Sequence, residues 1–168
     1  MAQKKSIRKV KKTLLLVGEG FSEKAFLSHL VSLFSKGGYK ISITTAKGKG
    51  PSNVISHAVS CKKNSGYDMV AVLLDTDLTW PAQKVREAES RKILLIGSTP
   101  CLEGLLLDIL QQKKFDKSAE CKNKVQKMLG DNLTDKKVYR QIFTEEVIFS
   151  AAKKIETLSK LISILSKA

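Results

Sequence analysis

The sequence predicts an α/β domain with a mostly parallel four-stranded sheet flanked by helices. Three observations predict this fold class. The apolar runs LLLV, MVAVLL and ILLI are typical of parallel strands buried on both faces. Segments with helical spacing follow the strands, so that strands and helices alternate up to residue 114. With 168 residues and 42% apolar residues, the chain is large enough to form one hydrophobic core without disulfide bonds or a structural metal.

The elements follow one another in a regular order. We expect strand 13–20, helix 22–38, strand 39–46, helix 53–64, strand 68–77, helix 81–90, strand 92–100 and helix 101–114. Glycines close the first strand, the second alternates apolar and polar residues, and the third stops on two aspartates. Ser22 is a good N-cap for the first helix, and Gly37-Gly38 ends it. Pro81 suits the first turn of its helix.

The last part of the chain has a different pattern. From about residue 115 it is polar, lysine-rich and helical. One face of a closing helix carries Ile155, Leu158, Leu161, Ile162 and Leu165. We therefore expect a flexible basic arm at 1–12, an α/β core at 13–114, and a helical C-terminal extension at 115–168 that packs on the core.

The charge is strongly positive and unevenly distributed. The chain has 30 Lys and Arg against 16 Asp and Glu, which gives +14. Residues 1–74 hold 13 of the basic residues and only three acids, namely Glu19, Glu23 and Asp68. A field of this sign attracts phosphate backbones, so the charge favours a nucleic-acid partner, either DNA or RNA. The alternative is a basic surface that only keeps the protein in solution.

Several classes of protein are disfavoured. The three cysteines have no C-x-x-C spacing and there are two histidines, so a structural zinc site is not expected. No apolar run reaches the roughly 18–20 residues that span a bilayer. The run behind the basic start is too short for a signal peptide. We expect a cytoplasmic protein without a membrane partner, and the sequence leaves open a partner protein or a homo-oligomer.

Acidic residues follow three of the predicted strands. Glu19 ends the first strand, with Glu23 four residues later, Asp75 and Asp77 end the third, and Glu103 opens the helix after the fourth. The carboxyl ends of parallel strands share one edge of the sheet, where ligands bind. A period of two would turn both aspartates to the same side. We expect all five carboxylates to gather at this edge.

Crowded carboxylates raise one another's pKa, and a divalent cation relieves this. Oxygen ligands suit Mg²⁺ or Mn²⁺, which can activate water against a phosphodiester. Lys47 and Lys49, on a glycine-rich loop at the same edge, and Ser98, in the exit of the fourth strand, are candidate phosphate contacts. The competing interpretations are structural: Glu23 and Glu103 as acids at helix N-termini, and the loop as a solvated turn.

Three motifs resemble TOPRIM proteins. LLLVGEGFSEKAFL resembles the opening of the TOPRIM domain, and its E-G-x-S-E form is similar to the OLD nucleases. VAVLLDTD resembles the TOPRIM DxD strand, and GSTPCLEGLLLDIL resembles a block of RloB-like TOPRIM proteins, which are bacterial defence proteins. This chain has Thr99 where asparagine is common, Leu102 where an aromatic residue is usual, and no ATPase half.

The resemblance covers about residues 13–112 and implies a Rossmann-like TOPRIM fold. It implies that Glu19, Asp75 and Asp77 bind the metal and act in catalysis, with Glu23 and Glu103 as further metal ligands. The expected activity is Mg²⁺- or Mn²⁺-dependent endonuclease cleavage of nucleic acid, in the context of phage defence.

Two other functions stay open at this point. DTDLT matches the D-x-D-x-T box of haloacid-dehalogenase phosphatases, in which Asp75 would be the nucleophile and GDNLTD at 130–135 the last acidic motif. The second alternative is a nucleic-acid-binding TOPRIM module without catalysis.

Overall fold

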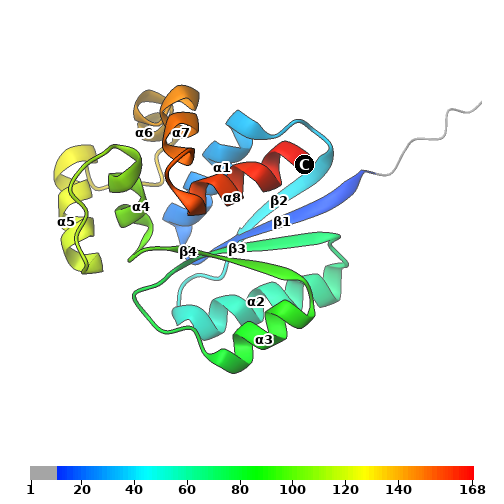
Figure 1. The fold of residues 1–168 in the computed structure, drawn as a ribbon. Coiled ribbons are helices and arrows are strands. Elements are labelled where there is room, and N and C mark those ends of the chain that lie inside the picture. Colours follow the sequence, from blue (N-terminus) through cyan, green and yellow to red (C-terminus); the bar gives the residue numbers. More distant parts are fainter. Residues whose placement is uncertain (1–10) are drawn as a thin grey trace, which may run out of the picture.

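The computed structural model describes residues 11–168 and confirms the α/β fold class (Figure 1). The four strands are β1 (Lys12–Gly18), β2 (Tyr39–Thr45), β3 (Met69–Asp75) and β4 (Ile93–Ser98). All pair in parallel, in the order β2-β1-β3-β4. The helices of the core are α1 (Phe21–Phe34), α2 (Gly50–Ser65), α3 (Ala82–Ser90) and α4 (Leu102–Ile109).

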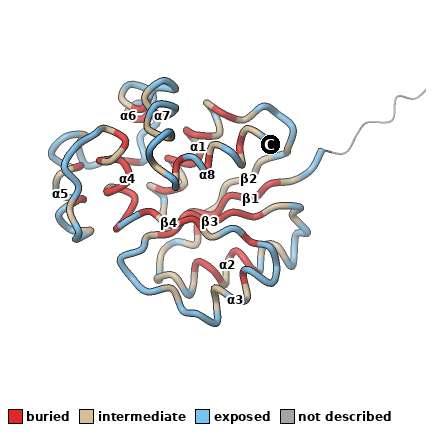
Figure 2. The backbone as a smooth tube through the Cα atoms, viewed as in Figure 1, coloured by how far each residue is buried: buried red, intermediate tan, exposed pale blue. Residues whose placement is uncertain are grey.

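The sheet is covered on both faces (Figure 1). Alternate residues of β1 divide between two hydrophobic clusters: Leu14 and Leu16 pack with α1 and α4, whereas Leu15 and Val17 pack with α2 and α3. The buried strands therefore run through the middle of the molecule (Figure 2). Burial on both faces explains why these strands are continuous apolar runs in the sequence.

The C-terminal extension consists of four helices on the α1 side of the sheet (Figure 1). They are α5 (Ser118–Leu129), α6 (Lys136–Ile142), α7 (Glu145–Ala152) and α8 (Glu156–Lys167). Helix α8 buries Leu158, Leu161 and Leu165 in the same cluster as the core residues. The Thr157 hydroxyl donates to the Gly97 carbonyl at 2.7 Å, which attaches α8 to β4. The predicted arm at 1–12 lies outside the described residues except for its last two, and Lys12 begins β1.

Some boundaries differ from the sequence expectations. Helix α1 begins at Phe21 with Gly20 as its N-cap, not at Ser22, because the Glu23 carboxylate accepts the Gly20 N–H at 2.7 Å. Helix α4 ends at Ile109 rather than near residue 114, since Gln111 takes a φ of 54° that no helix continues through. A side-chain hydrogen bond therefore sets the start of α1, and one backbone angle sets the end of α4.

Strand β1 is the point at which the strand order switches sides. It pairs with β2 on one side and with β3 on the other. In open α/β sheets, ligands bind outside the carboxyl ends of the strands at such a switch point. Here the register places Gly18 of β1 beside Leu73 of β3, so Glu19 and Asp75 follow on adjacent strands. The topology therefore brings the acids that follow the first and third strands to one edge of the sheet.

Within residues 11–168, no helix combines the length and the apolar character that crossing a membrane requires.

A carboxylate cluster at the carboxyl edge of the sheet

The turn between β1 and α1 holds two of the predicted acids. A Cβ atom at Gly18 would lie 2.8 Å from the Cβ atom of Glu23, so only glycine lets the helix start this close to the strand. Glu23 is consequently buried, at 8% exposure, while Glu19 is partly exposed. Burial raises the pKa of Glu23; its hydrogen bond from Gly20 opposes this, and the charges of Glu103 and Glu19 add to it.

The glycine-rich loop after β2 packs against this turn. The Glu19 carbonyl accepts hydrogen bonds from the Gly48 N–H at 2.9 Å and the Thr45 hydroxyl at 3.1 Å. Residues 47–50 all have positive φ, which costs energy at the two lysines and none at the two glycines. Lys47 and Lys49 are exposed. The structure therefore places both lysines in a loop bonded to the residue that carries the first acid.

Asp75 is the most constrained of the acids. Its Oδ1 atom accepts hydrogen bonds from the Ser98 hydroxyl at 2.9 Å and from the Leu102 N–H at 3.0 Å. The indole N–H of Trp80 donates to its backbone carbonyl at 2.8 Å. No donor among the described residues is bonded to Oδ2. The carboxylate is thus fixed by one oxygen and leaves the other free to take a ligand.

The pKa of Asp75 responds to the charges of the other acids. Its pKa is raised from 3.8 to about 7, chiefly by burial and then by the charge of Glu23, against the lowering effect of the Ser98 hydrogen bond. The charges of Glu19 and Glu103 raise it further. Four carboxylates from three segments of the chain therefore act on one another electrostatically. We call Glu19, Glu23, Asp75 and Glu103 the carboxylate cluster.

Asp77 lies differently from the sequence expectation. Strand β3 ends at Asp75, so the period of two does not extend to Asp77. The N–H groups of Thr76 and Asp77 donate to the Pro100 carbonyl, each at 3.0 Å, and this turns the chain toward the connection between β4 and α4. The Oδ2 atom of Asp77 accepts the Ser118 hydroxyl of α5 at 2.7 Å. Asp77 therefore borders the cluster on its α5 side.

The structure corrects the role predicted for Ser98. This residue is fully buried, and its hydroxyl lies within hydrogen-bond distance of both the Leu74 carbonyl (3.1 Å) and Asp75 Oδ1 (2.9 Å). A phosphate on the surface does not reach it. Ser98 positions the Asp75 carboxylate instead.

The extension contributes residues that the sequence analysis did not identify. Burial lowers the pKa of Lys122 on α5, but the charges of Glu103, Asp75 and Asp77, with that of Cys101, outweigh it and raise the pKa. Lys122 therefore stays protonated beside the acids. No local sequence signal marks it, because it lies in an ordinary lysine-rich helix and approaches the acids only through the packing of α5 on α4.

Tyr139 on α6 approaches the cluster from the interior. Its ring packs against Phe26 and His29, and its hydroxyl is the one buried side-chain polar atom among residues 11–168 that has no hydrogen-bond partner. Burial, and after it the charges of Glu23 and Glu103, raise the pKa of this phenol. The Tyr139 hydroxyl is thus uncharged, and it lies on the interior side of Glu23 and Glu103.

The cluster has the donor chemistry of a Mg²⁺ or Mn²⁺ site, although its members are not drawn together. In the described part of the chain, no three His, Cys, Asp or Glu side chains are close enough to hold a metal ion. Yet the mutual repulsion recorded at Asp75 and Glu23 is what a divalent cation relieves. Carboxylate oxygens are also the ligands that these ions prefer. The residues present therefore have the chemistry that suits such an ion, while their spacing among residues 11–168 is wider than a bound ion requires.

Comparisons with known proteins add no relative. A scan against protein-family models, a search of curated proteins and a search of solved structures each found no match. The TOPRIM resemblance therefore stays a prediction from the three motifs.

Proposed function

We propose that this protein is a metal-dependent nuclease that cleaves phosphodiester bonds in nucleic acid. The observation that carries the proposal is the Asp75 carboxyl, held by Ser98 and Leu102 and raised to a pKa of about 7 within a field of three further carboxylates. Strongly perturbed acids at a switch point are typical of functional sites. A neutral structural role would not require this concentration of negative charge.

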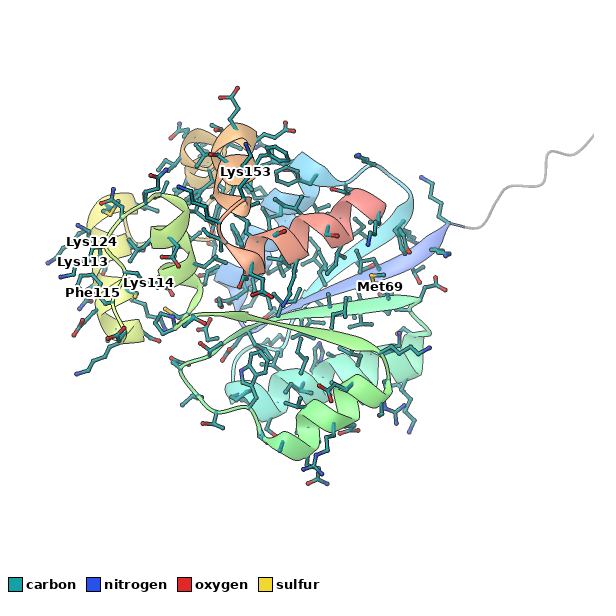
Figure 3. All side chains as sticks on the ribbon, in the orientation of Figure 1. Met69, Lys113, Lys114, Phe115, Lys124 and Lys153 are labelled. Carbon is teal, nitrogen blue, oxygen red and sulfur yellow. The ribbon has the colours of Figure 1, made fainter. Side chains whose placement is uncertain are left out.

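The charge around the cluster supports a phosphate-bearing substrate. Because the strand order is β2-β1-β3-β4, the loop after β2 with its two exposed lysines lies on one side of the acids. On the other side β4 leads to α4, and Lys113, Lys114 and Phe115 follow in the connection to α5 (Figure 3). Lysines thus occur in the segments on both sides of the strand ends, and positive charge of this kind attracts a nucleic-acid backbone.

The residues have separable tasks in this proposal. Glu19, Asp75 and Asp77 would hold the ion, with Glu23 and Glu103 supporting it or holding a second one. When bound, the metal supplies an activated water and polarises the phosphoryl oxygen. Ser98 and the Leu102 N–H fix Asp75, so that the free oxygen keeps its direction. The protonated Lys122 supplies positive charge on the α5 side, where charge develops on the phosphate.

The motifs that resemble RloB-like and OLD-like TOPRIM proteins support the same activity, in bacterial phage defence. The phosphatase alternative has less support. The last acidic motif of those enzymes follows a strand, whereas residues 130–135 follow helix α5. A nucleic-acid-binding module without catalysis is the alternative that the experiment has to separate.

The test is a cleavage assay with a matched pair of variants. The full chain is incubated with Mg²⁺ or Mn²⁺ and a panel of plasmid, single-stranded DNA and transfer RNA. Asp75→Asn keeps the shape and the acceptor of the side chain but removes its charge, and cleavage should fall about 100-fold or more. Asp108→Asn is the control, because Asp108 pairs with Lys114 at 2.6 Å on the outer side of α4. Cleavage that survives Asp75→Asn would refute the site.

An inactive wild type has a separate meaning. If the wild type cuts nothing on the panel but binds nucleic acid, the chain is a binding module and the nuclease proposal fails.

A further inference from the structure

Two of the largest exposed apolar side chains lie on the loops that carry the acids. Among the described residues, the large apolar side chains with high exposure are Phe21 (59%), Leu78 (57%), Phe149 (56%), Leu94 (43%) and Met128 (38%). Phe21 lies in the turn from β1 to α1, between Glu19 and Glu23 in sequence. Leu78 lies in the loop after β3, directly after Asp77. Single exposed apolar side chains are common on proteins, so what distinguishes these two is where they lie, namely beside the acids at the ends of β1 and β3.

The helix geometry determines where Phe21 faces. Phe21 is the first residue of α1, and Glu23 is the third. Two residues correspond to roughly 200° of rotation in an α-helix, so side chains at these positions lie on nearly opposite sides. Glu23 is buried against the sheet, and Phe21 is therefore directed out to solvent at the edge that carries Glu19. The described residues offer it no aromatic partner.

Leu78 lies beside a second aromatic residue. Together with Thr76, Thr79, Trp80 and Val85 it lines a shallow hollow on the β3–α3 side of the edge. Trp80 is itself fixed, because its N–H donates to the Asp75 carbonyl at 2.8 Å. One wall of this hollow is therefore hydrogen-bonded to the backbone of Asp75.

The exposed side chains of Phe21 and Leu78 suit single-stranded nucleic acid better than a duplex. A duplex presents phosphates and sugars to a protein surface and hides the faces of its bases, so a phenyl ring at the site would meet only polar atoms. An unpaired base exposes an apolar face, and aromatic side chains in single-strand binding sites stack on such faces. The lysines on both sides of the cluster complement the backbone of the same strand.

We propose that the substrate is single-stranded nucleic acid and that Phe21 stacks on an unpaired base next to the phosphate at the carboxylate cluster. Leu78, in the loop after β3, provides a second apolar contact. Stacking does not distinguish DNA from RNA, so both sugars are accepted at this contact. The inference rests on the proposed function for its choice of nucleic acid as the ligand.

The experiment measures binding without turnover. A fluorescent oligothymidylate of about 20 nucleotides, longer than the roughly 4–16 nucleotides that common single-strand modules cover, is titrated with the full chain in Ca²⁺. The same strand annealed to its complement is the duplex probe. Phe21→Ala should weaken single-strand binding about 5- to 150-fold, the range found for loss of one stacked base, and leave duplex binding nearly unchanged. Phe21→Tyr should retain the affinity, and the oligouridylate should show the same pattern.

Phe149→Ala is the matched control. Phe149 has the same side chain and nearly the same exposure, but it lies on α7 with Lys153 5.7 Å from its ring centre. Its loss should leave both affinities unchanged. The proposal is overturned if Phe21→Ala leaves single-strand binding intact, if it weakens single-strand and duplex binding equally, or if Phe149→Ala has the same effect.

A spectroscopic variant provides an independent readout. Phe21→Trp adds a second tryptophan to a chain that has one. Stacking predicts that the single strand quenches the added fluorescence and that the duplex does not, whereas equal or absent quenching contradicts it. Because Ca²⁺ replaces Mg²⁺ or Mn²⁺ in these assays, they measure binding independently of whether the protein cleaves the strand. Single-strand binding that depends on Phe21, in a chain that cuts nothing, would refute only the nuclease.

Discussion

The charge on Asp75 makes the stability of the protein depend on pH in a direction that can be worked out. The pKa is 3.8 for an ordinary aspartate and about 7 in the folded chain. Between these two values the folded state binds more protons than the unfolded state. The free energy of unfolding therefore falls as the pH rises from 3.8 to about 7, and the loss is complete above that pH. Asp75→Asn has no charge to bury and should escape this loss.

The size of the effect follows from the two pKa values. Each unit corresponds to about 1.4 kcal/mol, so the difference sets an upper limit of about 4 kcal/mol. Asp75 remains partly exposed, and solvent screening reduces this to about 1–2 kcal/mol. For a domain of this length, that corresponds to an increase in Tm of about 2–8 °C for Asp75→Asn at pH 8.

Thermal unfolding in EDTA, followed by circular dichroism from about pH 4 to pH 8, measures this difference. The advantage of Asp75→Asn should be small near the ordinary aspartate pKa and grow until the pH exceeds that of the folded group. Asp108→Asn loses an ion pair with Lys114 and should gain no stability at any pH. A difference between wild type and Asp75→Asn that is constant with pH, or a variant less stable at pH 8, would refute the electrostatic argument.

Three further substitutions test single contacts. Ser98→Ala removes the hydrogen bond that lowers the pKa of Asp75, so the pH at which cleavage sets in should move upward in a pH–rate profile. Tyr139→Phe removes a buried hydroxyl without a partner and should raise the free energy of unfolding by about 1 kcal/mol in urea titrations. Lys122→Met should lower the cleavage rate roughly 10- to 100-fold, because the charges of the acids act on Lys122, whereas Lys160→Met, which loses only an exposed pair with Glu156 on α8, should not.

The sheet could be predicted from sequence because its signals are local. A strand buried on both faces must be a continuous apolar run, and LLLV and MVAVLL contain no competing helical period. Parallel pairing then follows from the alternation with helices, and the shared carboxyl edge follows from parallel pairing. For this reason the proximity of Glu19 and Asp75 could be anticipated without any knowledge of side-chain positions.

The rest of the site depends on contacts that no local pattern contains. Ser98 is an ordinary strand-exit serine in sequence, and only its burial against Asp75 makes it a positioning residue. Asp77 leaves the strand geometry because the Pro100 carbonyl binds the two N–H groups that follow Asp75. Lys122 and Tyr139 are more than 40 residues from the last strand acid in sequence and reach the cluster through the packing of α5 and α6.

The chemistry at residue 75 argues for a ligand with positive charge. The side-chain oxygen that accepts from Ser98 and Leu102 would be present equally in asparagine, which has the same shape and no charge to bury. Structure alone therefore favours asparagine, because the carboxylate lowers stability at neutral pH. What aspartate adds is a negative charge, which the charges of Glu23, Glu19 and Glu103 oppose. We therefore expect the proposed cation to stabilise the folded chain, because its positive charge would offset the repulsion that the Asp75 carboxylate adds.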